Sequence, residues 1–362
     1  MAFYRKQCIS FMMSTKCNLA CSYCYLQDSV SVDQSLDFEF AKQGIRDYFA
    51  DSPSRHIRFF ACGEPTLEFE LIKAIKDFAH ELAGNDLSVE IQTNGVFSVK
   101  IANWLAHNAN IVWISHDGIP EVHDSLRPTI GGGKTSEVIE RNISLLLAQG
   151  CQVGLRATIT PLNLFRQVEI IQYFNKLGVK AVFSDPVFPA VSEEARHSKD
   201  KGLGSEFMMT YAREFVKARI VAEELGIFYG SFLAVNFDER TEVFCRSCLP
   251  SPNLTPDGYV TSCDMAFSKD ALPELVYGKY DRETGIIEYN NNRIAAIRLR
   301  KASNLVECQG CEVLYHCAGS CLGEGLNETG RILGVKQDYC DAIRYLAKHL
   351  PIDSGLYPYL HP

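Results

Sequence analysis

The chain has 362 residues, of which 46% are hydrophobic and 22% charged, a composition typical of globular proteins. Its length favours two domains rather than one. The net charge of −8 argues against nonspecific nucleic-acid binding, which would require a basic excess. No apolar run approaches the length of a membrane span and the N-terminus lacks signal-peptide features, so we expect a cytoplasmic protein. In that compartment, fourteen cysteines indicate metal or redox chemistry rather than disulfides.

Short apolar runs of strand length alternate with segments of helical periodicity over the first half of the chain. The expected strands are 8–13, 55–61, 87–92, 111–115, 153–159 and 180–183. The expected helices are 36–50, 71–82, 101–107, 136–149 and 165–177. This alternation predicts a parallel sheet with right-handed crossovers, in the form of a closed or partial β/α barrel.

The loop after the first expected strand carries Cys17, Cys21 and Cys24 in the spacing C-x3-C-x2-C. Thiolate is the preferred ligand of iron–sulfur clusters, and a [4Fe–4S] cluster takes four ligands. Three cysteines would therefore leave one iron open to bind a substrate or cofactor. A zinc knuckle is the alternative, although zinc would require a fourth ligand and no His or Cys lies between Cys24 and His56.

Polar motifs follow four further expected strands. Because ligands bind at the carboxyl ends of barrel strands, we expect these motifs to lie around the cysteine loop. Gly63, in the first of them, would allow close backbone approach to a cofactor, with a simple tight turn as the alternative. The motifs are C-G-E-P at 62–65, Q-T-N-G at 92–95, S-H-D-G at 115–118 and D-P-V-F at 185–188.

The second half departs from this pattern. Residues 192–204 are polar without apolar periodicity, which indicates a link between domains or a loop over the barrel mouth, and 206–225 predict a long helix. We therefore expect a core barrel over residues 1–190, a linker with a bridging helix over 191–240 and a cysteine-rich domain over 241–362.

Eight cysteines lie in this last segment, around P-D-G-Y-V at 256–260, which predicts a β-hairpin. Two [4Fe–4S] clusters would need about eight thiolates, and two zinc ribbons are the alternative. Of the three remaining cysteines, Cys8 and Cys151 have strand-like contexts and are expected to be ordinary buried residues. Cys62 lies beside the predicted site, where a redox role is the alternative.

The cysteine loop, with Tyr23 directly before its last cysteine, resembles that of the radical S-adenosylmethionine (radical SAM) superfamily. In that family the open iron binds the amino and carboxylate groups of S-adenosylmethionine (SAM). The second half contains C-x2-C-x5-C-x3-C and is similar to the SPASM extension of such enzymes. The resemblance implies a partial (β/α)6 TIM-like barrel, then a SPASM domain of a β-hairpin plus helices that holds two auxiliary iron–sulfur clusters. It covers residues from about 8 to 345.

This resemblance implies SAM as a cofactor and three [4Fe–4S] clusters, each with its own cysteines. The SAM-binding cluster would take Cys17, Cys21 and Cys24. One auxiliary cluster would take Cys245, Cys248, Cys263 and Cys321, and the other Cys308, Cys311, Cys317 and Cys340.

The other motifs imply SAM contacts. C-G-E-P looks like the family's G-G-E-P, which contacts the SAM amino group, with Cys62 replacing the first glycine. Residues 115–127 are similar to S-x-D-G-P-x3-H-x3-R of anaerobic sulfatase-maturating enzymes, from which His116 and Ile119 depart. An arginine suits the methionyl carboxylate. The alternatives are a solvated loop position for Arg127 and a core position for Phe188. The implied SAM contacts are Tyr23, Gly63, Glu64, Asn94, Ser115, Arg127 and Phe188.

The same resemblance implies hydrogen abstraction from a peptide or protein substrate, giving oxidation or cross-linking of a ribosomally made peptide. Asp264 occupies the place of the catalytic base, with a local hydrogen-bonding role in the hairpin as the alternative. An electron donor such as flavodoxin or ferredoxin is the expected partner. The alternatives are formylglycine formation in a sulfatase, modification of a small molecule such as a sugar or tetrapyrrole, and a structural metal protein that cleaves no SAM.

Overall fold

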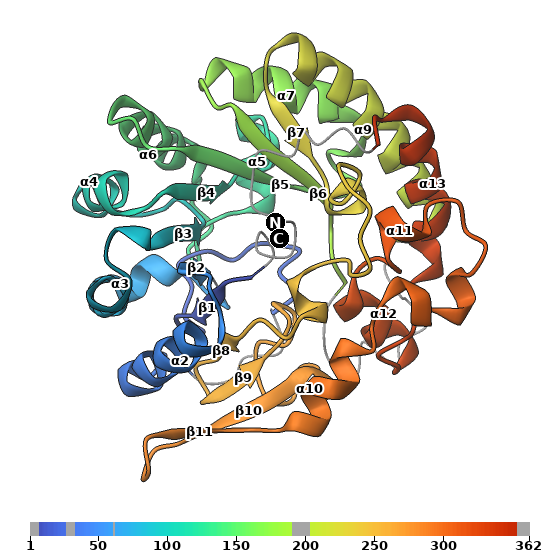
Figure 1. Cartoon of the computed structure of the whole chain (residues 1–362). Coiled ribbons are helices and arrows are strands. Elements are labelled where there is room, and N and C mark those ends of the chain that lie inside the picture. Colours follow the sequence, from blue (N-terminus) through green and yellow to red (C-terminus); the bar gives the residue numbers. More distant parts are fainter. Residues whose placement is uncertain (1–6, 27–32, 61, 190–202, 353–362) are drawn as a thin grey trace.

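The protein is represented by a computed structural model that describes residues 7–26, 33–60, 62–189 and 203–352. Its named strands form one sheet in the order β11-β10-β9-β8-β1-β2-β3-β4-β5-β6-β7. The sheet curves around the centre of the molecule, and helices of the first half cover its outer side (Figure 1). The expected α/β barrel-like fold with a parallel sheet is confirmed.

The first seven strands in chain order run parallel to one another, as strand–helix alternation requires. Residues pair in regular register, for example Ile9 with Ile57 and Phe11 with Phe59. The strands are buried on both faces, which explains why they appear in the sequence as continuous apolar runs. They are β1 (Ile9–Met12), β2 (His56–Phe60), β3 (Ser88–Thr93), β4 (Ile111–Ser115), β5 (Val153–Ile159), β6 (Ala181–Pro186) and β7 (Phe228–Gly230).

The helices between these strands bury one apolar face each against the sheet. In the first of them, Asp37 caps the amino end by accepting a hydrogen bond from Phe40 N–H at 3.1 Å, and Phe40 and Ile45 are fully buried. The helices of this layer are α2 (Phe38–Asp51), α3 (Phe69–Ala83), α4 (Val99–Asn108), α5 (Pro120–Leu126), α6 (Ser136–Ala148), α7 (Gln167–Lys176) and α9 (Ser205–Glu224).

Among the described residues of the first 240, two elements differ from the sequence expectation. The short helix α5 and the strand β7 were not expected; β7 pairs with β6 and lies within the segment predicted as a linker. Its three residues are too few to show a period of two. Most of the polar segment 192–204 lies outside the described residues.

The second half extends the same sheet. β8 (Asn253–Leu254) pairs in parallel with β1 and antiparallel with β9 (Tyr259–Thr261), so the expected hairpin is confirmed. Gly258 lies in the turn of this hairpin and has a φ of +88°. The remaining strands and helices are β10 (Val276–Asp281), β11 (Ile286–Tyr289), α10 (Asn291–Arg298), α11 (Leu314–Cys317), α12 (Leu322–Thr329) and α13 (Cys340–His349). The domain boundaries stay a prediction.

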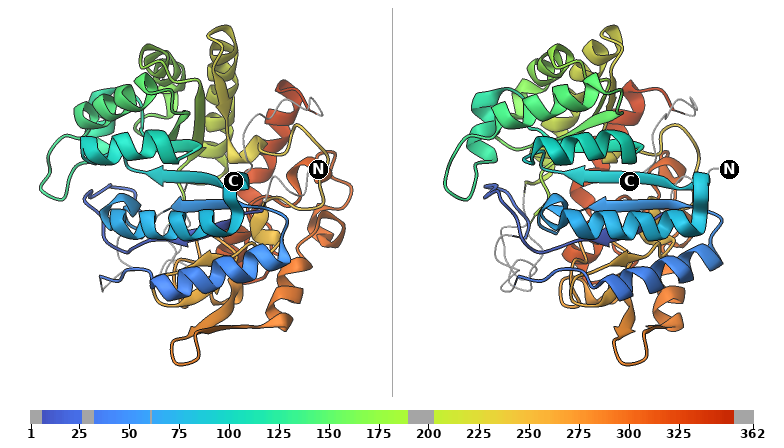
Figure 2. Two further views of the ribbon diagram at one scale, coloured as in Figure 1. Left: turned by 60° about the vertical axis from the view of Figure 1, so that its left-hand side comes forward. Right: turned by 90° about the vertical axis from the view of Figure 1, so that its left-hand side faces the viewer.

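Turned so that the blue to green helices face the viewer, the molecule shows them stacked one above another, with the orange and red second half behind and below them (Figure 2). The two halves are joined within the sheet by the pairing of β1 with β8, and α13 of the second half also packs against α9. No helix in the described part of the chain is both long and apolar enough to cross a membrane.

Candidate functional site

The loop after β1 carries Cys17, Cys21 and Cys24, whose thiols are free and half-buried. A hydrogen bond from Ala20 N–H to the Pro128 carbonyl, at 2.9 Å, ties the loop to the segment after α5. Burial, with Cys24 and Cys17 nearby, raises the pKa of Cys21 to about 11. The three thiols thus lie close enough to interact electrostatically, as three ligands of one cluster must.

The turn at 62–65 follows β2 and packs directly on this loop. Gly63 has a φ of +99°, and a Cβ added there would lie 2.3 Å from the Lys16 carbonyl oxygen and 2.6 Å from that of Ser14. The N–H of Glu64 donates to the same Lys16 oxygen at 2.7 Å. Glycine is therefore required at position 63 to seat the turn against the loop. Its expected contact with SAM stays a prediction.

Glu64 is almost completely buried, and its carboxylate is largely committed to the protein. Oε1 accepts hydrogen bonds from Thr66 N–H at 3.0 Å and from the hydroxyls of Thr66 and Thr93 at 2.6 Å each. Oε2 accepts from Asn94 N–H at 2.7 Å. Since a carboxylate offers roughly four acceptor sites, only Oε2 retains capacity for a further donor such as an ammonium group.

Asn94 lies beside the first cysteine of the loop. Its Nδ2 donates to Asn18 Oδ1 at 2.6 Å and lies 3.9 Å from Cys17 Sγ, while its Oδ1 accepts from Val96 N–H at 2.9 Å. Asn94, which was predicted to contact SAM, therefore also contacts the sulfur of Cys17. Hydrogen bonds to cysteine sulfur are one of the means by which proteins tune iron–sulfur potentials.

Asp117 joins two of the predicted SAM contacts. Its Oδ2 accepts hydrogen bonds from the Tyr23 hydroxyl at 2.5 Å and from Arg127 Nε at 2.8 Å, and the Arg127 guanidinium lies 5.2 Å from the Tyr23 ring centre. Asp117 Oδ1 accepts from Thr158 N–H at 2.9 Å. This role of Asp117 was not expected from the sequence. A carboxylate of SAM would have to use the N–H groups of Arg127 that Asp117 leaves open.

His123 supports the contact between Asp117 and Arg127 through two hydrogen bonds. Its Nδ1 accepts from Asp117 N–H at 3.1 Å, so Nε2 carries the proton and donates to the Thr135 hydroxyl at 3.1 Å. Thr135 in turn donates to the Arg127 carbonyl at 2.7 Å. Burial, with the charges of His116 and Arg127, lowers the pKa of His123 to about 2, so the ring stays neutral. The histidine and arginine of the motif therefore position one aspartate.

Two further predicted SAM contacts lie at the ends of neighbouring strands. Ser115 is the half-buried last residue of β4 and pairs with Arg156 of β5. Phe188 follows β6, is half-buried, and packs on Phe232 with ring centres 5.2 Å apart. Both lie on the strand ends where ligands bind in such barrels, and their SAM contacts stay predictions.

Asp264 is held between two buried arginines that were not expected at the site from the sequence. Arg58, from the middle of β2, donates to Oδ2 at 2.6 Å, and Arg246 donates to Oδ1. Burial alone would raise the pKa of Asp264, but the charges of Arg246 and Arg58 outweigh it and hold the pKa well below its usual range. Asp264 is ionised near neutral pH, and its side chain remains 33% exposed.

Tyr25 connects this aspartate to the cysteine loop. Its pKa is raised by burial and by nearby Asp264, Cys62, Cys24 and Cys263. Its ring lies 6.2 Å from that of Phe267. Tyr25 therefore lies between the first cysteine loop and the cysteine-rich half, a position that the sequence motif did not reveal.

Four cysteines of the second half form one group. Cys248 donates a hydrogen bond to Cys245, which lowers the pKa of Cys245 and raises that of Cys248. Burial, with Cys263 and Cys245 nearby, raises the pKa of Cys321. A Cβ added at Gly323, close to Cys321 in the chain, would lie 3.1 Å from Cys263 Sγ. These four are the set implied for one auxiliary cluster.

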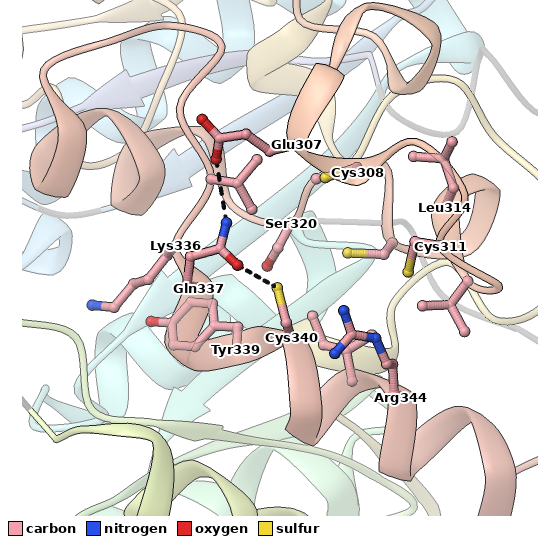
Figure 3. Close-up of a pocket in the computed structure, with 15 residues that line it drawn as sticks. Glu307, Cys308, Cys311, Leu314, Ser320, Lys336, Gln337, Tyr339, Cys340 and Arg344 are labelled. Carbon is pink, nitrogen blue, oxygen red and sulfur yellow. Dashed lines mark hydrogen bonds between the residues drawn. The ribbon is translucent and has the colours of Figure 1, made fainter.

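The other four cysteines line a pocket of about 490 Å³, which includes its open mouth. Figure 3 shows the sulfur atoms of Cys308, Cys311 and Cys340 around this space, with the Arg344 guanidinium beside them. Cys317 completes the set, and burial, with Cys340 and Cys308 nearby, raises its pKa to about 12. The structure thus brings together the second implied set, and cluster ligation by either set stays a prediction.

The three cysteines outside these groups are all buried. Burial raises the pKa of Cys62 to about 12 and that of Cys151 to about 11, so both are protonated thiols. Cys8 lies 3.5 Å from the Ser10 hydroxyl. A protonated thiol is a poor nucleophile, so these features favour the ordinary buried role over the redox alternative at Cys62.

No three or more His, Cys, Asp or Glu side chains among the described residues are arranged to hold a single metal ion. In a [4Fe–4S] cluster each cysteine binds a different iron, so the sulfurs are farther apart than the ligands of one zinc ion. This finding therefore concerns single-ion sites and leaves the cluster sites to be tested by metal analysis.

Comparison with known proteins matches residues 11–174 to the Radical SAM superfamily. The chain is 31% identical over 183 residues to an uncharacterized protein of Methanocaldococcus jannaschii, covering 50% of this chain and 63% of that protein, which is less than two thirds of its length. It is 23% identical over 338 residues to the serine-type anaerobic sulfatase-maturating enzyme of Bacteroides thetaiotaomicron, covering 84% of this chain and 80% of that enzyme.

The fold is similar to a solved structure of native anSMEcpe with bound AdoMet and Cp18Cys peptide. The TM-score is 0.70 and the identity 19%, with 94% of this chain and 96% of that chain covered. At this identity the likeness shows a shared fold. It extends through the second half of the chain, beyond the segment matched by the family.

Proposed function

Because residues 11–174 form a radical SAM domain, we propose that this protein cleaves SAM reductively and abstracts a hydrogen atom from a peptide or protein substrate, which is thereby oxidised or cross-linked. The observation that supports this proposal best is the packing of Gly63 and Asn94 onto the loop of Cys17, Cys21 and Cys24. A bare zinc knuckle would not need strand-end motifs fitted against it.

The residues present fit the cofactors that the family implies. Three thiols on one loop would hold a cluster with one open iron, and the neighbouring motifs offer the polar groups that an amino acid cofactor needs. When bound, the cluster and SAM supply a 5′-deoxyadenosyl radical that abstracts hydrogen. In our proposal the SAM contacts come from Tyr23, Gly63, Glu64, Asn94, Ser115, Arg127 and Phe188.

Each of these residues would bind the part of SAM that matches its chemical character. The remaining acceptor capacity of Glu64 Oε2 suits an ammonium group, whereas the open N–H groups of Arg127 suit a carboxylate. Asp117 and His123 fix Arg127 so that little rotamer entropy is lost on binding. Phe188, backed by Phe232, offers an apolar surface for the adenine.

The two groups of four cysteines would hold two auxiliary [4Fe–4S] clusters. A substrate radical that loses a proton and an electron is oxidised, and such clusters are suited to accept the electron. Asp264 is the proposed base. Arg58 and Arg246 keep the carboxylate ionised and oriented, so that it is available to accept a proton. The same two positive charges make it a weaker base.

A peptide partner is supported by the fold shared with a peptide-bound structure. Formylglycine formation in a sulfatase is the second candidate, favoured by the match across most of the Bacteroides enzyme. Modification of a sugar or tetrapyrrole is the third. We place the protein in the cytoplasm, with flavodoxin or ferredoxin as its electron donor.

Deuterium transfer tests the substrate class. Peptides with deuterated Ser, Cys and aromatic side chains would be incubated with reduced enzyme and SAM, and the 5′-deoxyadenosine analysed by mass spectrometry. We expect deuterium in the nucleoside and a mass change in the peptide; an aldehyde at Ser or Cys would select the sulfatase reading. Transfer only from a deuterated sugar or tetrapyrrole would contradict the peptide proposal.

A further inference from the structure

Arg300 follows α10, and its side chain is completely buried. Its hydrogen-bond partners are backbone carbonyls: Nη1 donates to Ile332 at 2.9 Å and to Gly334, and Nη2 donates to Gly319 at 2.8 Å. Its Nε has no hydrogen-bond partner in the part of the chain that the structure describes. The guanidinium is thus held in place from several sides.

Three other deeply buried arginines each contact a carboxylate. Arg58 and Arg246 both pair with Asp264, and Arg127 pairs with Asp117. Among the described residues, no carboxylate lies within 4.0 Å of the guanidinium nitrogens of Arg300. A buried guanidinium stays protonated, and an isolated buried charge is costly. Within the described part of the chain, its counter-charge is therefore not an acidic side chain.

The backbone contact of Arg300 places it between the two cysteine groups. Gly319 lies midway between Cys317 and Cys321 in the chain, and these two cysteines belong to different groups. The Nη2 atom would lie only 3.3 Å from a Cβ added at Gly319, so this segment passes directly against the guanidinium.

The same Nη2 atom would lie 3.4 Å from a Cβ added at Gly325, on the helix α12 that follows Cys321. The guanidinium therefore packs against the chain on both sides of Cys321.

We propose that Arg300 is the buried counter-charge shared by the two auxiliary clusters and that it raises the reduction potential of both. The inference rests on the proposed function, since it requires clusters in both cysteine groups. A cluster held by four thiolates carries net negative charge, and reduction adds one more electron to it. A nearby buried cation stabilises the reduced form, because cluster potential depends on local charge.

The test compares Arg300→Met with Lys301→Met, which removes the same charge from the exposed neighbouring side chain. Both would be made in the full chain carrying Cys17→Ala, Cys21→Ala and Cys24→Ala, so that only auxiliary clusters contribute to electron paramagnetic resonance during a redox titration. Arg300→Met is expected to disfavour reduction of both clusters tenfold or more, about 59 mV for a one-electron couple. Lys301→Met is expected to leave both potentials unchanged.

Arg300→Lys keeps the charge and loses the guanidinium hydrogen bonds, and it is expected to retain both clusters near their parent potentials. Unshifted potentials in Arg300→Met, or a shift of only one cluster, would overturn the proposal. If Arg300→Met binds no iron, Arg300→Lys becomes the deciding variant, and loss of iron from Arg300→Lys as well would overturn the proposal for Arg300. Metal analysis of the parent chain tests the proposed function separately, because zinc instead of iron in both cysteine groups would contradict the cluster assignment itself.

Discussion

At the scale of single residues, the site is held by contacts that its own motifs make with one another. Glu64, Asn94 and Asp117 spend most of their hydrogen-bonding capacity on neighbouring motif residues. Such side chains are already ordered before any ligand binds, and preorganisation of this kind lowers the entropic cost of binding.

Gly63→Ala should dislodge the cysteine loop, because the added Cβ would overlap the Lys16 and Ser14 carbonyl oxygens. We expect loss of about four irons per chain, those of one cluster. Gly84→Ala is the matched control: Gly84 also has positive φ, at +57°, but no atom lies within 4 Å of its added Cβ. Gly84→Ala should lower the free energy of unfolding by about 1 kcal/mol and leave the iron content unchanged. Equal iron in both variants, measured after anaerobic reconstitution, would refute the role of Gly63.

Spacing in the sequence is informative for cysteines because cluster ligands must be close whatever the intervening fold. Spacing pointed to Cys17, Cys21 and Cys24 and to most cysteines of the second half, and the family resemblance supplied the division of the last eight into two sets. Spacing did not locate Arg58 or Arg246, since their contact with Asp264 joins segments far apart in the chain. A charged residue inside the apolar strand H-I-R-F-F was the available signal for Arg58.

At the scale of elements, β4 and β5 begin and end where the sequence predicts, because their apolar runs have polar boundaries. β7 was missed because three residues show no period, and α5 because its seven residues, which begin at Pro120, are too few to establish a helical period. A buried pair joins the first residue of β2 to the third residue of β3, with His56 Nε2 lying 3.4 Å from Glu90 Oε2.

The pair between these strands predicts acid sensitivity. Burial alone would raise the pKa of Glu90, but the His56 hydrogen bond and the Arg58 charge lower it to about 2. Since the unfolded pKa is about 4.3, the stabilisation is complete above that pH and is lost as pH falls toward 2. Glu90→Gln should lower the free energy of unfolding near neutral pH by about 3 kcal/mol. In this variant the free energy of unfolding should also fall less steeply as the pH is lowered from about 4.3 to about 2.

Urea unfolding of the metal-free chain between pH 2 and 7 measures this effect. Glu70→Gln is the control, because Glu70 pairs with Lys73 at the exposed surface, where solvent screens the interaction. A parallel pH profile for Glu90→Gln and the wild type would show that the pair contributes nothing to acid sensitivity.

At the scale of the whole molecule, one sheet carries both halves, and the two cysteine groups of the second half are separate, because only Cys308, Cys311, Cys317 and Cys340 line the pocket. The grouping predicts independent loss of clusters. Cys340→Ala should remove the cluster of the pocket group, and Cys248→Ala that of the other group, each costing about four irons of twelve. Cys151→Ala, at a buried cysteine outside the groups, should cost none. Loss of all auxiliary iron from either variant would contradict two separate sites.

The central claim is that this chain uses a three-cysteine cluster to cleave SAM, and one measurement tests it most directly. The chain and its Cys24→Ala variant would be reconstituted anaerobically, assayed for iron, sulfide and zinc, and incubated with dithionite and SAM before chromatography. We predict about twelve irons and formation of 5′-deoxyadenosine by the wild type, with about eight irons and no 5′-deoxyadenosine for Cys24→Ala. Zinc in place of iron, or intact SAM under reduction, would contradict the account.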